Sequence, residues 1–199
     1  MEWNILAAQN FNIIEQKIPK EGFSPAEYEI VRRVVYSSGD LEYAGQVKFA
    51  HQPLTAGAAA LQKRVPIIVD AMAIRTEIST LLERTFVNPI ACLDSVATPQ
   101  KQRQELALRH PQAIYVVGKN LLWLSLLLEL VKSSQISPSL IVATPAGFTR
   151  KEKISRQLKL SNIPHIRVDS SKGGISPAIA IVKGLITLAW LAYNQTMEG

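Results

Sequence analysis

Residues 31–40, VRRVVYSSGD, place a phenol one helical turn after two guanidinium groups. Tyr36 follows Arg32 by four residues and Arg33 by three, and residues at these spacings lie on the same side of a helix. A guanidinium group in this position can lower the pKa of the phenol or stack on its ring. Tyr36 could therefore donate a proton or a hydrogen bond to a ligand. The alternative is an aromatic side chain that packs at the rim of the core.

Other residues suited to ligand binding follow short apolar runs. Cations and glycine-bearing loops stand after several of these runs, and cations together with backbone N–H groups bind carboxylates or phosphates. We single out as candidate ligand-binding residues Asp70, Lys119, Pro145, Gly147, Phe148, Arg150, Lys172, Gly173 and Gly174.

The apolar runs predict strands that would bring these residues together. Five runs are bounded by turn residues, at 65–69, 89–93, 113–117, 140–143 and 165–168, and helix-length segments separate them. Continuous apolar strands that alternate with helices indicate an α/β fold. We expect a Rossmann-like domain over residues 1–199, with three layers and a mostly parallel five-stranded sheet flanked by helices. In such sheets ligands bind outside the carboxyl ends of the strands.

The helix that carries Tyr36 has the clearest boundaries. Ser24, Pro25 and Glu27 are typical of a capped helix start, and Gly39 is typical of a helix end. The pattern predicts a helix over 25–38 whose apolar stripe leaves Tyr36 at the edge of the core. Further helices are predicted over 54–64 and about 177–193.

Length and composition favour one cytoplasmic domain. The chain has 199 residues, 47% of them hydrophobic, and a single cysteine. The amino terminus lacks the basic start and long apolar stretch of a signal peptide. The apolar run 121–131 is shorter than the roughly 20 residues that span a bilayer, so we interpret it as a buried helix and expect no membrane partner.

Positive charge is concentrated in one segment. The net charge is +6, and residues 150–172 contain seven basic and two acidic residues. A local excess of this kind suggests an anionic partner such as a polycarboxylate, a phosphate or a nucleic acid. Lys153, Arg156 and Lys159 recur at helical spacing, so a solvated helix face is the alternative.

Several other chemistries have little support. His51, His110 and His165 are scattered and lack metal-site spacing, so no metal is expected. Nucleotide-binding glycine motifs are missing from the sequence, and few aromatic residues accompany the cations, which argues against nucleic acid. Asp70 and Asp94 could be paired carboxylates or simple caps.

The order of these features resembles the precorrin-8X methylmutase family of cobalamin biosynthesis, from about Asn10 to Leu191. The matching motifs are Phe23-Ser24-Pro25, Gly39, Val69-Asp70-Ala71, Pro145-Ala146-Gly147-Phe148 and Gly173-Gly174. The resemblance implies an isomerase without a cofactor that moves a methyl group from C11 to C12 of a corrin precursor. It further implies a tetrapyrrole polycarboxylate substrate and a homodimer. A non-catalytic corrinoid-binding protein is the alternative.

The resemblance also assigns site residues and shows departures. Tyr36 stands where the family has its acid catalyst, a histidine. Asn10 stands in place of a serine and Ser79 in place of a threonine, and Arg103 is a loose match to a family arginine. By this resemblance Tyr36 is the catalytic residue. Asn10, Arg32 and Ser79 join the residues named above as substrate-binding.

Overall fold

The sheet has the predicted parallel core and one further strand. The computed structural model describes residues 5–93, 99–148 and 150–197. Within these ranges the strands form one sheet in the order β1-β6-β5-β4-β2-β3. They are β1 (Val47–Ala50), β2 (Ile67–Val69), β3 (Ile90–Cys92), β4 (Ile114–Val117), β5 (Leu140–Ala143) and β6 (His165–Val168). The five predicted strands are confirmed as β2–β6. The sequence-based count of five was one too low, because β1 adds an antiparallel edge to β6.

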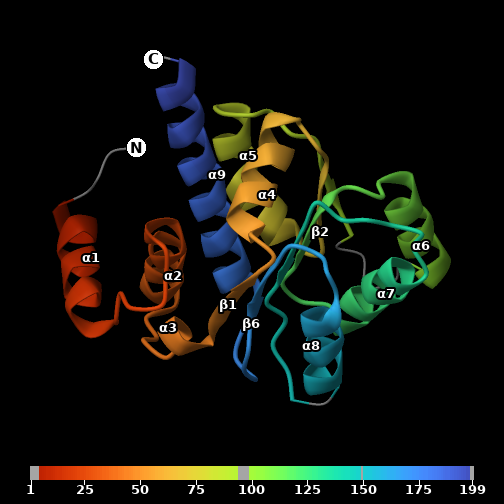
Figure 1. Cartoon of the computed structure of the whole chain (residues 1–199), viewed down its shortest axis with the longest axis horizontal. Helices are drawn as coiled ribbons and strands as arrows, with labels where there is room; N and C mark the ends of the chain where they lie inside the picture. Colours follow the sequence, from red (N-terminus) through yellow and green to blue (C-terminus); the bar gives the residue numbers. More distant parts are fainter. Residues whose placement is uncertain (1–4, 94–98, 149, 198–199) are drawn as a thin grey trace.

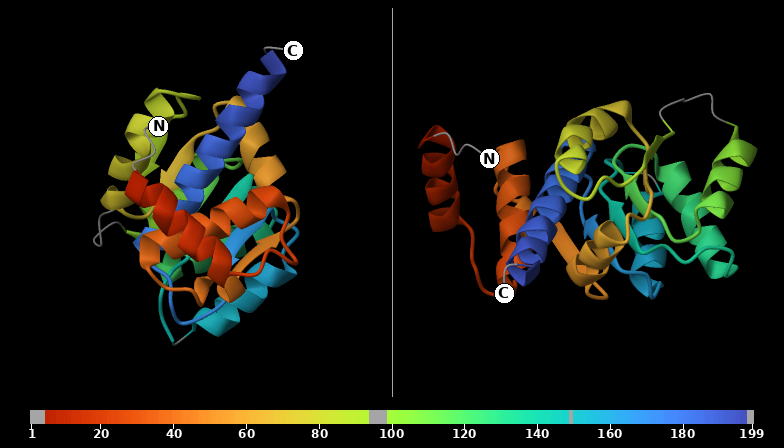
Figure 2. Two further views of the ribbon diagram at one scale, coloured as in Figure 1. Left: turned by 90° about the vertical axis from the view of Figure 1, so that its left-hand side faces the viewer. Right: turned by 90° about the horizontal axis from the view of Figure 1, so that it is seen from above.

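Helices cover both faces of the sheet, which confirms the three layers (Figure 1). One face carries α2 (Pro25–Ser38), α4 (Pro53–Gln62), α5 (Met72–Glu83) and α9 (Ile175–Met197). The other carries α6 (Gln100–Arg109), α7 (Leu121–Lys132) and α8 (Lys151–Leu160). The first helix, α1 (Ile5–Lys17), packs outside α2, and the short α3 (Tyr43–Gln46) leads into β1 (Figure 2).

Alternate residues of the strands β2, β4 and β5 enter two separate cores. Ile67 and Val69 of β2 face the cluster beneath α2, α5 and α9, whereas Ile68 faces the cluster beneath α7 and α8. This alternation follows from the two-residue period of a strand. The predicted buried helix at 121–131 is confirmed as α7, which supplies much of the second core.

The helix that carries Tyr36 begins and ends where its sequence predicts. The Ser24 side chain accepts a hydrogen bond from the Glu27 N–H, and the Glu27 carboxylate accepts one from the Ser24 N–H. Gly39 adopts the left-handed conformation at the helix end, with φ 67°. A Cβ at Gly184 of α9 would lie 2.6 Å from the Ile30 side chain, so this glycine lets α2 approach α9 closely.

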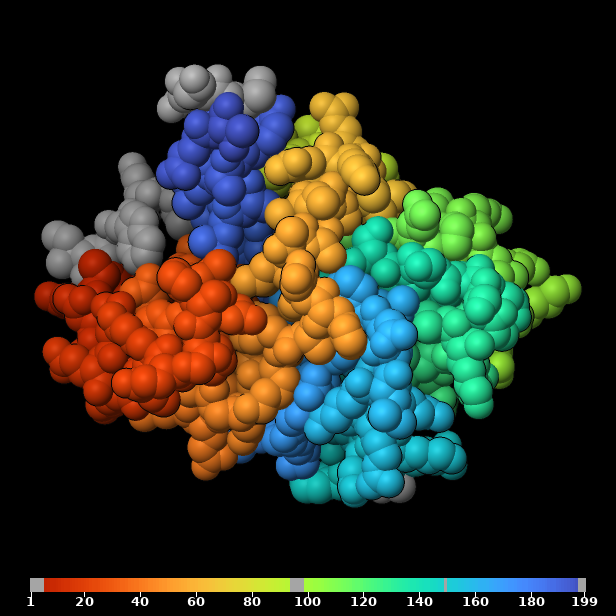
Figure 3. Space-filling view, viewed as in Figure 1, coloured from red at the N-terminus to blue at the C-terminus, as the bar shows by residue number. Residues whose placement is uncertain are grey.

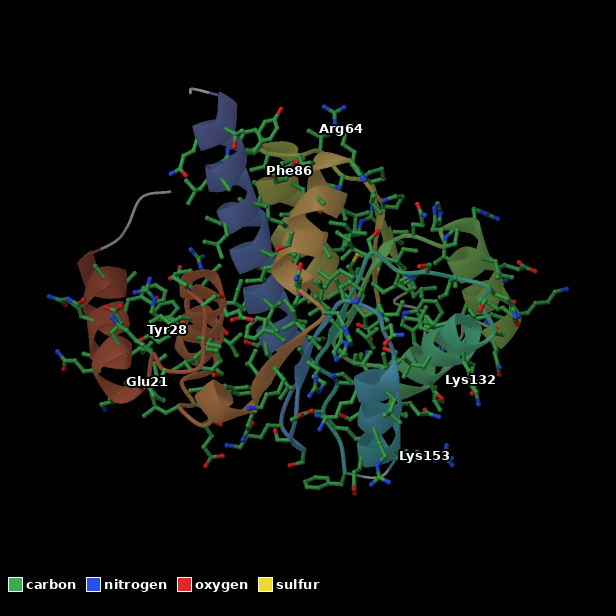
Figure 4. The ribbon with its side chains drawn as sticks, viewed as in Figure 1. Glu21, Tyr28, Arg64, Phe86, Lys132 and Lys153 are labelled. Atoms are coloured by element: carbon green, nitrogen blue, oxygen red, sulfur yellow. The ribbon has the colours of Figure 1, made fainter. Side chains whose placement is uncertain are left out.

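The last helix is the one candidate for a membrane span among the described residues. Residues 175–196 are long and apolar enough by length and composition, and half of the most apolar window is buried inside the protein. In the fold α9 packs against α2, α4, α5 and β5. Figure 4 shows Phe86 beside this helix, where its ring meets the rings of Trp190 and Tyr193 edge-on. These contacts are those of a core helix.

Candidate active site

A cavity of about 750 Å³ lies among α1, α2, α5 and α9. The residues that line it from α1 and α2 are Ala7, Phe11, Arg33, Tyr36 and Ser37. Those from α5 and α9 are Ala73, Glu77, Ile175, Ser176, Ile179, Ala180 and Lys183. Seven of these twelve lining residues are aliphatic or aromatic. The cavity reaches the carboxyl edge of the sheet, because Ala73 and Ile175 closely follow the ends of β2 and β6.

Tyr36 lies in the wall of this cavity. Its side chain is 43% exposed, whereas Val34 and Val35 beside it are buried, so the predicted position at the edge of the core is confirmed. The ring stacks on Phe11 of α1 with a centroid distance of 4.8 Å and an interplanar angle of 21°. Stacking fixes the plane of the phenol and leaves its hydroxyl group as a polar group in a mainly apolar wall.

The two arginines before Tyr36 act on other groups. Arg32 and Arg33 both donate to the Glu29 carboxylate, Arg33 through Nε at 2.8 Å. The Arg32 guanidinium carbon lies 4.7 Å from the centroid of the Phe11 ring. The predicted arginine stacking therefore falls on Phe11, which in turn stacks on Tyr36. Arg32 of α2 thus contacts the aromatic pair through its α1 member, Phe11.

Two polar contacts in the cavity were missed by the sequence reasoning. Glu77 of α5 and Lys183 of α9 form an ion pair with Nζ and Oε2 2.5 Å apart. The hydrogen bond from Lys183 lowers the pKa of the Glu77 carboxyl below its usual value. The Ser176 hydroxyl lies 3.4 Å from the Ser37 carbonyl oxygen and joins the start of α9 to the end of α2. Only the packing of α5 and α2 on α9 brings these distant residues together.

Asp70 holds the loop after β4. Its carboxylate is 4% exposed and accepts hydrogen bonds from the backbone N–H groups of Gly118, Lys119 and Asn120 at 2.8, 2.9 and 2.7 Å. Asn120 caps α7 by accepting from the Trp123 N–H. Of the two roles considered for Asp70, the structure shows the cap. Its proposed partner, Asp94, lies outside the described residues.

The paired glycines before α9 make a close backbone crossing. Gly173 has φ 149°, and a Cβ there would lie 2.2 Å from the Thr144 carbonyl oxygen. The Gly174 N–H donates to that same oxygen, and the Thr144 hydroxyl donates to the Gly174 carbonyl. This crossing joins the ends of β5 and β6 and fixes where α9 and its cavity residues begin.

The remaining glycine-bearing loop belongs to a second hollow of about 470 Å³. It is lined by Gly147 and Phe148 after β5, by α8, and by residues 168–171. Phe148 is 87% exposed, and Pro145 is buried at the end of β5. Of the predicted site residues, Tyr36 lines the first cavity, whereas Gly147 and Phe148 line this second hollow. The helices beside them, α2 and α8, cover opposite faces of the sheet. Figure 3 shows α8, in cyan, at the surface of the molecule.

Most of the basic segment is paired within the protein. Arg156 pairs with Glu152, and both Lys159 and Arg167 pair with Asp169. Lys172 pairs with Asp40 and Glu42, with both nitrogen–oxygen distances 2.6 Å, and so ties the loop before α9 to the end of α2. Lys153 points away from the body of the protein (Figure 4). The cationic field is therefore weaker than the residue count suggests.

Lys151 of this segment is buried, and no local sequence pattern predicts this burial. The Nζ donates to the Lys172 carbonyl at 2.8 Å, and burial lowers the pKa of the amine to about 8. This hydrogen bond links the start of α8 to the loop before α9.

The other predicted residues lie on exposed surfaces or are engaged locally. Asn10 is exposed on α1, next to Phe11. The Ser79 hydroxyl donates to the Arg75 carbonyl within α5, and Ser79 is not part of the cavity lining. The Lys119 and Arg150 side chains are exposed, and neither forms an ion pair with a described residue.

Two of the three histidines are closer together than their separation in sequence suggests. The rings of His51 and His165 lie 6.0 Å apart. His165 opens β6 at its amino end, as predicted, but it is buried, and burial lowers its pKa. No group of three His, Cys, Asp or Glu side chains suited to a metal occurs in the part of the chain that the structure describes.

The fold and the cavity define a three-layer α/β protein with its candidate site at the carboxyl edge of a mostly parallel sheet. The sequence model of the precorrin-8X methylmutase family matches residues 6–188. The chain therefore belongs to the precorrin-8X methylmutase family.

Individual relatives agree with this assignment along nearly the whole chain. The cobalt-precorrin-8 methylmutase of Synechocystis sp. is 31% identical, over 92% of this chain and 94% of its own length. That of Methanocaldococcus jannaschii is also 31% identical, over 84% and 82%. The crystal structure of precorrin-8X methylmutase from Thermus thermophilus superimposes with a TM-score of 0.82 at 27% identity, over 94% of this chain and 96% of that one.

Proposed function

We propose that this protein is a methylmutase of cobalamin biosynthesis that moves a methyl group from C11 to C12 of precorrin-8X or cobalt-precorrin-8. The observation that carries the proposal is the position of Tyr36, whose phenol stands in the wall of a mainly apolar cavity at the carboxyl edge of the sheet. Family membership identifies the reaction, and the cavity supplies a place for it.

The cavity suits a flat tetrapyrrole. Apolar side chains from α1, α5 and α9 can cover the face of a macrocycle, and the hydroxyl groups of Tyr36, Ser37 and Ser176 can meet its polar edge. A 1,5-sigmatropic methyl shift takes place within one molecule and transfers no electrons or groups to a second one. The residues of the site therefore need only bind the ring, orient it and polarise it.

The phenol is a weaker acid than the histidine that it replaces. Unperturbed tyrosine and histidine side chains have pKa values of about 10 and 6.5, a gap worth about 5 kcal/mol in proton-donating strength. General acids work best when their pKa lies near the ambient pH. We propose that Tyr36 polarises the ring by donating a hydrogen bond and that full proton transfer is not required.

We propose three roles for the other site residues: contact with the ring, binding of its carboxylate groups, and support of neighbouring side chains and loops. We place Asn10 at the open edge of the cavity, and we assign Lys119, Arg150 and Lys172 to the carboxylate groups at the periphery of the macrocycle. Arg32 supports Phe11 and thereby Tyr36. The loops that contain Asp70, Pro145, Gly147, Phe148, Gly173 and Gly174 shape the carboxyl edge of the sheet. We assign Ser79, whose hydroxyl group binds the Arg75 carbonyl, a supporting role within α5.

We further propose a cytoplasmic homodimer. Leu6 and Ile13 of α1 are 64% and 50% exposed, and α1 forms one wall of the cavity. A second copy packed on α1 would bury these side chains and complete the enclosure of the substrate. Light scattering should give a mass close to twice the 22.0 kDa of the chain, and a strictly monomeric protein would contradict this part of the proposal.

Single-turnover conversion of the substrate, followed by its visible spectrum, tests the reaction. Tyr36→Phe should abolish turnover because the donor is lost, and Tyr36→His should raise the rate because a stronger acid is restored. Tyr193→Phe is the matched control, since Tyr193 packs on Trp190 in a different part of α9. An unchanged rate in Tyr36→Phe would remove the phenol from the mechanism.

The same experiment separates an enzyme from a carrier. Replacement of the family histidine by a much weaker acid is the observation that favours a non-catalytic corrinoid-binding protein. Such a protein would shift the visible spectrum of the corrin product on binding but would not convert the substrate. Absence of any spectral shift at micromolar protein would contradict both the enzyme and the carrier.

A further inference from the structure

The Glu77–Lys183 ion pair is placed where a bound macrocycle would meet it. Both residues line the cavity that contains Tyr36. Glu77 lies one turn after Ala73 on α5, and Lys183 lies one turn after Ile179 and Ala180 on α9. The pair therefore stands at the end of an apolar wall, on the side of the cavity formed by α5 and α9.

Lys183 is the more available of the two cations in the cavity. Arg33 has a side chain only 17% exposed and donates through Nε to Glu29. Lys183 is 36% exposed and Glu77 is 52% exposed, so water reaches both ends of their contact. An exposed ion pair contributes little to stability, and breaking it costs little. The Lys183 ammonium can therefore change partners. The guanidinium of Arg33 is less exposed, and it could change partners only by giving up its hydrogen bond to the half-buried Glu29 carboxylate, which Arg32 would then hold alone.

Because the macrocycle carries carboxylate side chains, it brings the same chemical group that Glu77 now offers to Lys183. A lysine ammonium is a compact charge with three donors on a flexible stem, and it accepts a new carboxylate without strict geometry. Glu77 would then compete with the substrate for one cation and would also repel its carboxylates from the cavity.

We propose that Lys183 binds a peripheral carboxylate of the corrin substrate by exchange with Glu77, so that Glu77 sets the affinity of the site. This inference rests on the proposed function. It makes Lys183 a substrate-binding residue and Glu77 a residue that limits binding.

Hydrogenobyrinate is the corrin that the proposed methyl shift of precorrin-8X would produce, and titration of its visible spectrum with each protein tests the exchange. Lys183→Gln should weaken binding roughly tenfold, since it removes a charge-assisted hydrogen bond. Lys183→Arg should retain most of the affinity because the charge remains. Glu77→Gln should tighten binding several-fold, roughly three- to tenfold, because the competing carboxylate is gone. The methyl ester of the same corrin, which lacks the carboxylates, should bind all four proteins equally.

Glu152→Gln provides the matched control. It removes the acid of an exposed pair with Arg156 at 3.2 Å, on the other side of the sheet, and should leave binding unchanged. Circular dichroism and thermal melting verify that every variant is folded.

The outcomes separate the two proposals. If the wild-type protein binds and the variants at both positions remain within twofold of Glu152→Gln, the exchange is wrong and the proposed function stands. If Glu77→Gln weakens binding as much as Lys183→Gln, the pair is structural and the exchange is again wrong. If the wild-type protein does not bind the corrin at all, the proposed function fails and the exchange fails with it.

Discussion

Replacing Asp70 with alanine should destabilise the carboxyl edge of the sheet. The substitution removes the acceptor of three backbone hydrogen bonds that hold the loop after β4. Gly118 is buried, and its N–H would be left without a partner, at a cost of about 1–3 kcal/mol. Lys119 is exposed and Asn120 is half-buried, so water can replace the acceptor there at about 0.5–1 kcal/mol each. We expect a total loss of about 2–5 kcal/mol in the free energy of unfolding.

Urea denaturation followed by circular dichroism measures this loss. Asn120→Ala is the reference, because it removes only the single N-cap hydrogen bond to the Trp123 N–H and should cost about 1 kcal/mol. Asp70→Ala should exceed that reference by at least twofold with an unchanged slope against urea. If Asp70→Ala proved no worse than Asn120→Ala, the carboxylate would not be the support of this loop.

Three further perturbations test the loops around the site. Gly173→Ala should destabilise by roughly 1–3 kcal/mol in the same urea assay, because of its positive φ and the 2.2 Å approach of a carbonyl oxygen, whereas Gly45→Ala, with open space around it, should not. Burial lowers the pKa of Lys151 to about 8 in the folded protein, so the unfolded chain binds more protons than the folded one above that pH. The free energy of unfolding, measured relative to Lys151→Met, should therefore rise by roughly 2 kcal/mol from pH 8 to 10. A difference between the two proteins that does not change with pH would contradict the burial of Lys151. Lys172→Met should raise the pKa of the Asp40 carboxyl toward its usual value in an NMR titration, since the hydrogen bond from Lys172 now lowers it.

Much of the sheet could be predicted from sequence, because buried parallel strands are continuous apolar runs. All five such runs are strands. The strand β1 was missed because it has four residues, one of them Lys48, and lies at the edge, where one side needs no apolar residue. The helix α1 was missed because no cap residue or regular apolar stripe marks it.

The candidate site could be predicted only in part. The position of Tyr36 at the rim of the core followed from the periodicity of its helix. Its stacking on Phe11 could not be predicted, because it depends on how α1 lies across α2. The pairing of Lys172 with Asp40 and Glu42 joins residues more than a hundred positions apart, and no local pattern signals such a contact.

A crystal structure of the protein with hydrogenobyrinate tests the central claim most directly. We predict that the edge of the macrocycle lies in the cavity among α1, α2, α5 and α9, with a ring atom within hydrogen-bonding distance of the Tyr36 hydroxyl. A corrin bound instead against α8, with the phenol turned away from it, would contradict the account.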